Sequence, residues 1–287
     1  MKRPTLAVVP AVAAAIGFYC ALLLALLSLE AQLVFRPWRG GETSPATLGL
    51  RYRDVPLVTR DGVRLSSWFV PGGEPSGGPD TGPRHGHGPR VLLFCHGNAG
   101  NLSNRLGRLR VLHGLGLSLL MFDYRGYGRS GGDPSEDGVY TDAEAAWDYL
   151  ITDGGYRAEE IVVHGHSLGG AVAARVARVH APGALILESS FTSAPDLAVH
   201  HFPLFAIRGL MRNRFDTIGA LRRVTSPVLV VHSRDDAIVP FVLGRRLYAA
   251  AAPPKAFLEI SGAHNSGFLT SGGRYTEGLR RFLAGIR

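Results

Sequence analysis

The sequence predicts an α/β fold, with about eight strands in a mostly parallel sheet and helices covering both faces. From Arg90 onward, short apolar runs that suit buried strands alternate with longer stretches that suit helices. Upstream, the alternating runs Asp54–Arg60 and Arg64–Val70 flank Asp61 and Gly62, which predicts a hairpin. The predicted strands are Val91–Cys95, Ser118–Asp123, Ile161–His164, Ala184–Glu188, Val228–His232 and Ala256–Ile260, and the predicted helices are Leu102–His113, Thr141–Ile151, Leu168–Val179, Pro195–Met211, Phe241–Ala250 and Arg274–Ile286. The segment between the strands that end near Glu188 and begin at Val228 has room for a short lid only.

An uncharged apolar run, Leu6–Leu29, spans about 24 residues and is long enough to cross a bilayer with some tilt. Lys2 and Arg3 precede it. A signal peptide normally has a shorter apolar core followed by a small-x-small cleavage site, and no clean site of that kind follows this run. We therefore predict an uncleaved, single-pass membrane anchor. Basic residues on both sides of the run leave its orientation open, although we favour a globular domain on the non-cytoplasmic side.

The chain of 287 residues is thus expected to contain a membrane anchor (1–30), a polar linker (31–53) and one α/β domain (54–287). Within the domain, Pro71–Pro89 is too rich in Gly and Pro to form a core, and we expect a mobile loop. Its two histidines, His85 and His87, make only a weak case for a metal ion, so no metal site is expected.

The net charge of +8 comes almost entirely from arginine, since Lys2 and Lys255 are the only lysines. No stripe of arginine and aromatic residues or known nucleic-acid motif accompanies this charge, so no nucleic acid is expected as a partner. Cys20 and Cys95 are too few for a disulfide framework, and both are expected to be buried.

The residues Gly165-His166-Ser167-Leu168-Gly169 follow the apolar run Ile161–Val163 and lead into a predicted helix. A strand that ends in Gly-x-Ser-x-Gly and runs directly into a helix is the nucleophile-elbow pattern. The turn must be tight enough to push the Ser167 hydroxyl clear of the backbone, which leaves no room for side chains at Gly165 and Gly169. Ser167 is therefore the predicted nucleophile.

The loop His96-Gly97-Asn98-Ala99-Gly100-Asn101 follows the first core strand. Ligands of open α/β sheets bind at the carboxyl ends of the strands, where this loop and the elbow meet. Enzymes with the Gly-x-Ser-x-Gly pattern use one amide from this loop and the amide after the nucleophile as an oxyanion hole. We therefore expect the backbone N–H groups of Asn98 and Leu168 to bind an oxyanion.

Two later strand ends carry an acid and a base. Asp235 and Asp236 follow the strand Val228–His232, and His264 follows the last strand. Taken singly, such residues are more often helix caps or solvated surface groups. Their order after Ser167, each at a strand end, instead predicts a triad in which the histidine takes the serine proton and the acid orients the histidine.

Three motifs resemble those of the α/β-hydrolase superfamily: His-Gly-Asn-Ala-Gly-Asn at 96–101, Asp-Tyr-Arg-Gly-Tyr-Gly-Arg-Ser at 123–130 and Gly-His-Ser-Leu-Gly-Gly at 165–170. The resemblance is closest to the serine aminopeptidase-like branch that includes the bud-emergence (Bem) type hydrolases, and it covers roughly residues 54 to 287. It implies an α/β-hydrolase fold and selects Asp236 over Asp235 as the acid, from its spacing to His232 and Pro240. It also fits one N-terminal membrane segment. We expect a structural role for the second motif.

The predicted function is a membrane-anchored serine hydrolase that cleaves ester or thioester bonds of acyl chains through an acyl-enzyme, with a small molecule or an acylated protein as substrate. Side chains and backbone amides perform this chemistry, so no cofactor is expected. One alternative is a serine peptidase of the aminopeptidase kind, which needs an acid in the pocket to hold an amine, and His200–Asp216 offers only Asp216. The other is a ligand-binding protein with the same fold and little turnover.

Overall fold

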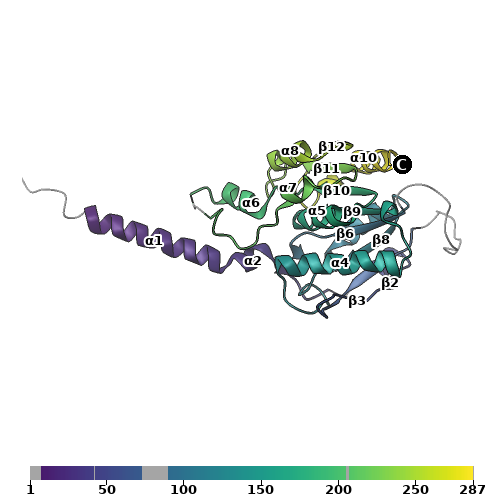
Figure 1. The fold of residues 1–287 in the computed structure, drawn as a ribbon, viewed down its shortest axis with the longest axis horizontal. Coiled ribbons are helices and arrows are strands. Elements are labelled where there is room, and N and C mark those ends of the chain that lie inside the picture. The colour runs from purple at the N-terminus through teal and green to yellow at the C-terminus, as the bar shows by residue number, and fades with distance from the viewer. Residues whose placement is uncertain (1–7, 42, 73–89, 205–206, 287) are drawn as a thin grey trace, which may run out of the picture.

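The computed structural model describes residues 8–41, 43–72, 90–204 and 207–286 (Figure 1). Its main sheet has eight strands in the order β12-β11-β10-β9-β6-β8-β5-β2, which agrees with the predicted sheet. The strands from β12 to β8 are parallel, and β5 and β2 are antiparallel to their neighbours. These strands are β2 (Arg53–Asp54), β5 (Ser67–Val70), β6 (Val91–Cys95), β8 (Ser118–Phe122), β9 (Ile161–His166), β10 (Ala184–Glu188), β11 (Val228–Ser233) and β12 (Lys255–Ile260).

Helices cover both faces of the sheet because every central strand is buried on both sides. On one face, leucines of α3 and α10 pack with alternate strand residues such as Leu92 and Ile186. On the other face, α4, α5, α7 and α8 pack on residues such as Leu93 and Leu187. The helices are α3 (Leu106–His113), α4 (Glu136–Thr152), α5 (Leu168–His180), α6 (Ala194–His201), α7 (Thr217–Leu221), α8 (Phe241–Ala250), α9 (Gly267–Thr270) and α10 (Gly273–Ala284), with 3₁₀ turns at Pro45–Leu48, Leu102–Arg105 and Ala158–Glu160.

Three predicted helices have different bounds. The helix predicted over 102–113 divides into a 3₁₀ turn, Leu102–Arg105, and α3, which begins at Leu106. α4 begins at Glu136 rather than at residue 141, because the Ser135 side chain accepts a hydrogen bond from the Gly138 N–H (3.1 Å) and caps the helix there. The helix predicted over 195–211 ends at His201, since Pro203 disfavours helical backbone at the residue before it. The described residues 202–204 and 207–216 form no helix or strand, and α7 follows them, a helix that the sequence did not predict.

The predicted hairpin divides between two sheets. β3 (Leu57–Val58) and β4 (Arg64–Leu65) pair with each other in a small sheet of their own, while β2 and β5 join the edge of the main sheet. The predicted mobile loop, Pro71–Pro89, falls mostly on residues 73–89, which lie outside the described residues together with His85 and His87.

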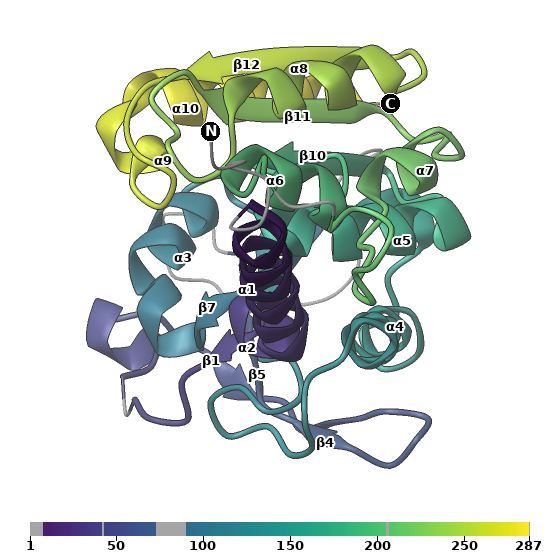
Figure 2. The ribbon, with the colours of Figure 1, turned by 90° about the vertical axis from the view of Figure 1, so that its left-hand side faces the viewer.

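The N-terminal helix α1 (Val8–Ser28) projects from one side of the domain (Figure 1). Pro10–Ser28 is long and apolar enough to cross a membrane by length and composition, and no part of it is buried in the protein. Figure 2, which looks along α1, shows the helix over the middle of this side of the domain, near α6. Cys20 is exposed on α1, a helix whose apolar span is not buried in the protein, which corrects the expected burial, whereas Cys95 is buried in β6.

The segment predicted as a linker is partly built into the domain. A short helix, α2 (Glu30–Val34), follows α1 and buries the Glu30 side chain. β1 (Arg36–Pro37) then pairs in parallel with β7 (Ala99–Gly100), which belongs to the loop that follows β6. The N-terminal segment is therefore attached directly to the carboxyl end of the sheet.

A buried ion cluster ties α3 and α10 to the carboxyl end of β10. Arg108 Nη1 donates to Glu188 Oε2 (2.7 Å), and the Tyr275 hydroxyl donates to the same oxygen (2.7 Å). His164 Nε2 lies 3.1 Å from it. Burial opposes ionisation of Glu188, but Arg108 and then His164 outweigh it and hold the pKa of this carboxyl well below its ordinary value. The cluster lies directly beneath the elbow, because the Ser167 N–H donates to the Glu188 carbonyl (2.9 Å).

We expect Arg108→Met to lower the free energy of unfolding by about 3–5 kcal/mol, because it leaves Glu188 as a buried charge without its cation. Arg110→Met is the matched control: it lies two residues away on α3, is exposed, and is expected to change stability by less than about 0.5 kcal/mol. Chemical denaturation of the full chain in detergent measures both. Equal losses in the two variants would contradict the role assigned to the cluster.

Candidate active site

Ser167 occupies a strained turn between β9 and α5. Its backbone has φ 56° and ψ −121°, a conformation that residues with side chains rarely adopt. A side chain at Gly165 would collide with the Gly169 carbonyl, and one at Gly169 would collide with the Cys95 carbonyl. The two glycines thus allow the elbow to pack against β6 and α5, as the sequence analysis expected.

The structure brings Ser167, His264 and Asp236 into one chain of hydrogen bonds. His264 Nε2 lies 3.0 Å from Ser167 Oγ, and His264 Nδ1 lies 2.7 Å from Asp236 Oδ2. A carboxylate only accepts, so Nδ1–H donates to Asp236 and Nε2 is free to accept the serine proton. All three side chains are nearly buried, at 6%, 7% and 6% exposure. Asp235 lies elsewhere and accepts the Gly262 N–H (2.8 Å), so the acid that contacts His264 is Asp236.

Asp236 is held as a carboxylate. Burial opposes its ionisation, but the hydrogen bond and charge of His264 and the N–H groups of Ile238 (2.9 Å) and Val239 (2.8 Å) outweigh burial and lower its pKa below the ordinary value. His232, beneath it, is kept neutral because burial lowers its pKa, and its Nε2–H donates to the Val239 carbonyl (2.9 Å). The turn after β11 therefore fixes the carboxylate toward His264.

The two amides predicted to bind an oxyanion belong to peptide groups whose carbonyl oxygens accept side-chain hydrogen bonds. His96 Nδ1–H donates to the Gly97 carbonyl (2.7 Å), and Ser190 Oγ–H donates to the Ser167 carbonyl (2.9 Å). The C=O and N–H of a trans peptide point in opposite directions, so the N–H groups of Asn98 and Leu168 point away from these partners. Leu168 also begins α5, where the amides have no partner within the helix. Both residues line a cavity beside Ser167.

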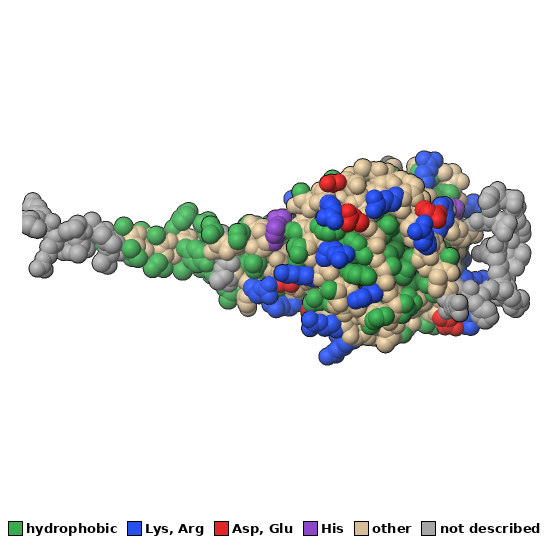
Figure 3. Space-filling model, turned by 90° about the horizontal axis from the view of Figure 1, so that it is seen from above, with side chains coloured by type: hydrophobic (Ala, Val, Ile, Leu, Met, Phe, Trp, Pro, Cys, Tyr) green, Lys and Arg blue, Asp and Glu red, His purple; other side chains and the backbone are tan. Residues whose placement is uncertain are grey.

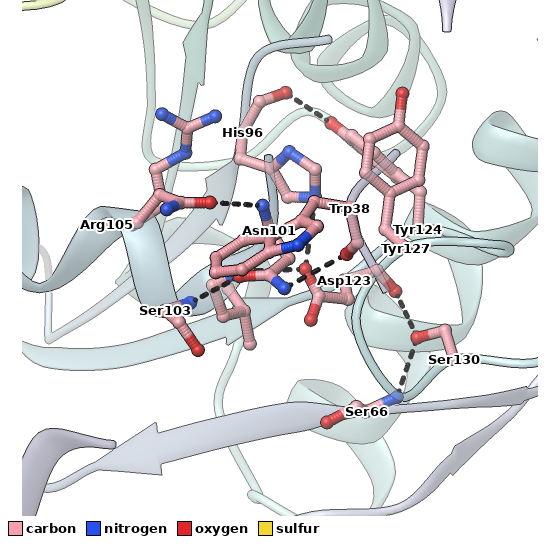
Figure 4. Close-up of polar contacts among 12 residues, drawn as sticks. Trp38, Ser66, His96, Asn101, Ser103, Arg105, Asp123, Tyr124, Tyr127 and Ser130 are labelled. Atoms are coloured by element: carbon pink, nitrogen blue, oxygen red, sulfur yellow. Dashed lines mark hydrogen bonds and ion pairs between the residues drawn. The ribbon is translucent and has the colours of Figure 1, made fainter. Parts of the chain in front are cut away.

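A network of tyrosines and backbone groups holds the loop that carries Asn98, and Figure 4 shows its contact between Tyr124 and His96. Tyr124 donates to the His96 carbonyl (3.1 Å) and Tyr127 to the Asn98 carbonyl (2.7 Å). On the outer side, the Arg36 N–H also donates to the Asn98 carbonyl (2.9 Å). The tyrosines of the motif at 123–130 thus hold this loop, which supports the structural role expected for the motif, but the sequence did not predict that they and β1 act on this particular loop. Those contacts join segments that are distant in sequence, so no local sequence pattern predicts them.

Two titratable groups beneath this loop are shifted by burial. Burial raises the pKa of Asp123 to about 7 and lowers the pKa of His96 to about 3. Asp123 nevertheless accepts the Leu102 N–H (2.9 Å), which ties the start of the next turn to the loop. A neutral His96 is the form that can hold the Gly97 carbonyl without placing a buried charge next to Arg105.

The cavity beside Ser167 has a volume of about 200 Å³ and a largely apolar lining. Phe191, Leu197, Ile207 and Met211 come from the segment around α6. The remaining wall comes from the N-terminal segment, which the sequence analysis did not assign to the site: Leu26, Leu27, Glu30, Leu33 and Val34. Of the lid histidines, His201 lines the cavity and donates through Nε2 to the Ile238 carbonyl (2.8 Å). In the described part of the chain, no group of three or more metal-ligating side chains is placed to hold a metal ion.

Comparisons with known proteins agree with this architecture. The family model of the serine aminopeptidases S33 matches residues 87–217. The chain is 38% identical over 281 residues to an uncharacterized protein of Mycobacterium tuberculosis, covering 98% of this chain and 94% of the relative. It is 34% identical over 283 residues to the alpha/beta hydrolase domain-containing protein WAV2 of Arabidopsis thaliana, covering 90% and 88%. It is 35% identical over 190 residues to the lysophosphatidylserine lipase ABHD12 of Macaca fascicularis, covering 59% and 47%.

Among solved structures, the esterase Pf2001 of Pyrococcus furiosus superposes with a TM-score of 0.69 at 20% identity, covering 87% of this chain and 98% of that one. This likeness concerns the fold. The order of the strands and the elbow between β9 and α5 agree with the relative named for its alpha/beta hydrolase domain, which matches over most of both chains. This chain belongs to the α/β-hydrolase superfamily.

Proposed function

We propose that this hydrolase cleaves carboxylic ester or thioester bonds of acyl chains through a covalent intermediate on Ser167. The observation that carries the proposal is the hydrogen-bonded chain Ser167–His264–Asp236 at the end of an apolar cavity. An apolar cavity beside a nucleophile suits a hydrocarbon acyl group better than a charged or strongly polar one. The relatives named as a lipase and an esterase are consistent with this substrate class.

In the first half of the reaction, Ser167 Oγ attacks the carbonyl carbon while its proton passes to His264 Nε2. The carbonyl oxygen becomes an oxyanion and accepts the N–H groups of Asn98 and Leu168. Asp236 stabilises the imidazolium through the Nδ1–H hydrogen bond. The tetrahedral intermediate then collapses, the alcohol or thiol leaves with the proton from His264, and the acyl group stays on Ser167.

In the second half, water replaces the leaving group. His264 takes a proton from the water, whose oxygen attacks the acyl carbon and again forms an oxyanion at the same amides. Collapse returns the proton to Ser167 and releases the carboxylic acid. The side chains, the backbone amides and one water molecule supply every proton transfer and every bond change in this cycle.

The peptidase alternative finds less support in the cavity. An aminopeptidase must hold a substrate ammonium, and among the residues that line the cavity the acidic side chain is Glu30. Both Glu30 oxygens already accept hydrogen bonds, from the N–H groups of Arg212 (3.0 Å) and Asn213 (2.7 Å). Asp216, the acid considered from the sequence, caps α7 by accepting the Gly219 N–H (3.0 Å).

We also propose that α1 anchors the enzyme in a membrane. The support is its apolar span of 19 residues, of which no part is buried in the protein. Exposed Val12, Ile16, Phe18 and Leu24 would be costly in water and suit a lipid environment. The side of the membrane on which the domain lies stays a prediction, with the non-cytoplasmic side favoured.

Labelling with a fluorophosphonate probe tests the nucleophile. We expect the wild type to label and to hydrolyse p-nitrophenyl esters, and Ser167→Ala to lose labelling and to lower kcat by about 10⁴–10⁶. Thermal unfolding of Ser167→Ala checks that the fold is intact. A folded wild type that neither labels nor turns over would instead favour the ligand-binding alternative.

Substitution of the two neighbouring aspartates tests the acid. We expect Asp236→Asn to lower kcat by about 10³–10⁴, because the amide stabilises neither the required tautomer nor the imidazolium. Asp235→Asn is the matched control, with an expected loss below about tenfold, since its amide oxygen can still accept the Gly262 N–H. Equal losses in kcat would refute the assignment of Asp236.

A series of p-nitrophenyl esters from acetate to palmitate tests the acyl part of the proposal. We expect kcat/KM to rise from acetate toward longer chains, by roughly tenfold or more, because added methylenes are buried in the apolar cavity. Rates that stay flat along the series, in a protein that still labels at Ser167, would show that the acyl chain is not what the cavity recognises.

A further inference from the structure

The cavity beside Ser167 shares its wall with the apolar N-terminal helix. Leu26 and Leu27 line the cavity and also belong to the span Pro10–Ser28. Leu33 and Val34 of α2 continue the same wall toward the sheet. If α1 crosses a membrane, its last turn lies at the membrane surface, and this wall of the cavity lies there with it.

A second part of the cavity lining comes from the segment between α6 and α7, through Ile207, Met211 and Phe215 among its described residues, and this segment is attached to the N-terminal segment. Glu30, only 7% exposed, accepts the backbone N–H groups of Arg212 and Asn213 and the Asn213 side-chain N–H (2.9 Å). Glu136 accepts the next two backbone N–H groups, those of Arg214 (2.5 Å) and Phe215 (2.7 Å). These carboxylates hold the segment over the cavity. They also fix its distance from the last turn of α1, which ends at Ser28 and is called the foot of α1 below.

The outer surface of this segment has the composition of a membrane-facing surface. Leu204 and Leu210 are large apolar side chains with 84% and 51% exposure, and Phe202, which also lines the cavity, is 37% exposed. Arg208 and Arg212, between and beside them, are exposed as well. Basic side chains also gather where α1 meets the domain (Figure 3). Apolar side chains with arginines between them suit the boundary between acyl chains and anionic headgroups.

We propose that the acyl chain of a membrane lipid passes from the leaflet into the cavity along the foot of α1, so that the N-terminal helix is one wall of the substrate site as well as an anchor. This inference rests on the proposed acyl hydrolase function. The occupant is an acyl chain because the shared wall is apolar apart from Glu30, whose carboxylate is already hydrogen-bonded, and because Ser167 lines the same cavity. A chain that follows this path stays in contact with apolar side chains and does not cross water, which lowers the free energy of extraction from the leaflet.

Bulky substitutions on two faces of α1 test the shared wall. Leu26 lines the cavity, whereas Leu24, two residues earlier, is 65% exposed and points away. In full-length protein in phosphatidylcholine nanodiscs, we measure the ratio of kcat/KM for p-nitrophenyl palmitate to that for p-nitrophenyl acetate. We expect Leu26→Trp to lower this ratio by about tenfold or more and Leu24→Trp to leave it within about twofold of the wild type.

A ratio that is the same in both variants overturns the inference, even where both esters are hydrolysed more slowly. Labelling of Ser167 by a fluorophosphonate in the wild type does not depend on this ratio. The labelling therefore tests the proposed function, and the ratio tests the shared wall. If Leu26→Trp does not fold, Leu33→Trp replaces it, with Leu29→Trp as its control. Leu33 and Leu29 are exposed to the same extent, 50% and 51%, and only Leu33 is among the residues that line the cavity.

Fluorescence quenching tests whether the segment between α6 and α7 reaches the leaflet. Leu204→Trp places a tryptophan on its outer surface, and Val179→Trp places one at the far end of α5, where Val179 is 52% exposed. In vesicles of brominated phosphatidylcholine, after subtraction of the wild-type signal, we expect quenching of the tryptophan at residue 204 and none at residue 179. Absence of quenching at residue 204 would overturn the proposed path from the leaflet.

Discussion

The first turn of α5 lies directly against the carboxyl end of β6, and the arrangement of the site depends on this close approach. Gly169 meets the carbonyls of Cys95 and His96 with no space for a side chain between them. Because α5 starts here, Ser167 takes its strained backbone conformation and Leu168 lines the cavity beside it. The same approach brings the loop after β6, with Asn98, next to Ser167. A larger residue at Gly169 would separate all of these groups at once.

The surrounding layers keep this turn in place. Beneath it, the Ser167 N–H and carbonyl are held by β10 and Ser190, and β10 is tied to α3 and α10 by the buried Glu188 cluster. Beside it, the tyrosines after β8 and the strand β1 hold the carbonyls of the loop after β6. Strained backbone persists only where its neighbours determine it, and here the neighbours come from five separate parts of the chain.

The N-terminal segment links the site to the helix outside the domain. β1 pairs with β7, Glu30 holds the segment after α6, and Leu26 and Leu27 border the cavity. The position of the loop that carries Asn98 and the shape of the cavity are therefore both connected to the last turn of α1. A tether with no role in the site would have no need of these contacts, and their presence is the physical basis for treating the helix as part of the substrate path.

The sequence by itself determined the class of sheet, the strand ends and the chemistry expected at Ser167, since apolar periodicity and the Gly-x-Ser-x-Gly spacing are local properties of the chain. It also placed an acid and a base at later strand ends, but the choice between Asp235 and Asp236 needed a family resemblance, because both aspartates fit the local pattern. Tertiary structure decided which one contacts His264: the turn after β11 directs Asp236 inward and Asp235 toward Gly262. It alone revealed the roles of Tyr127, Arg36 and Glu30, and the wall formed by α1. These roles arise from contacts between segments far apart in sequence, whose formation depends on how the whole chain packs and leaves no local signature.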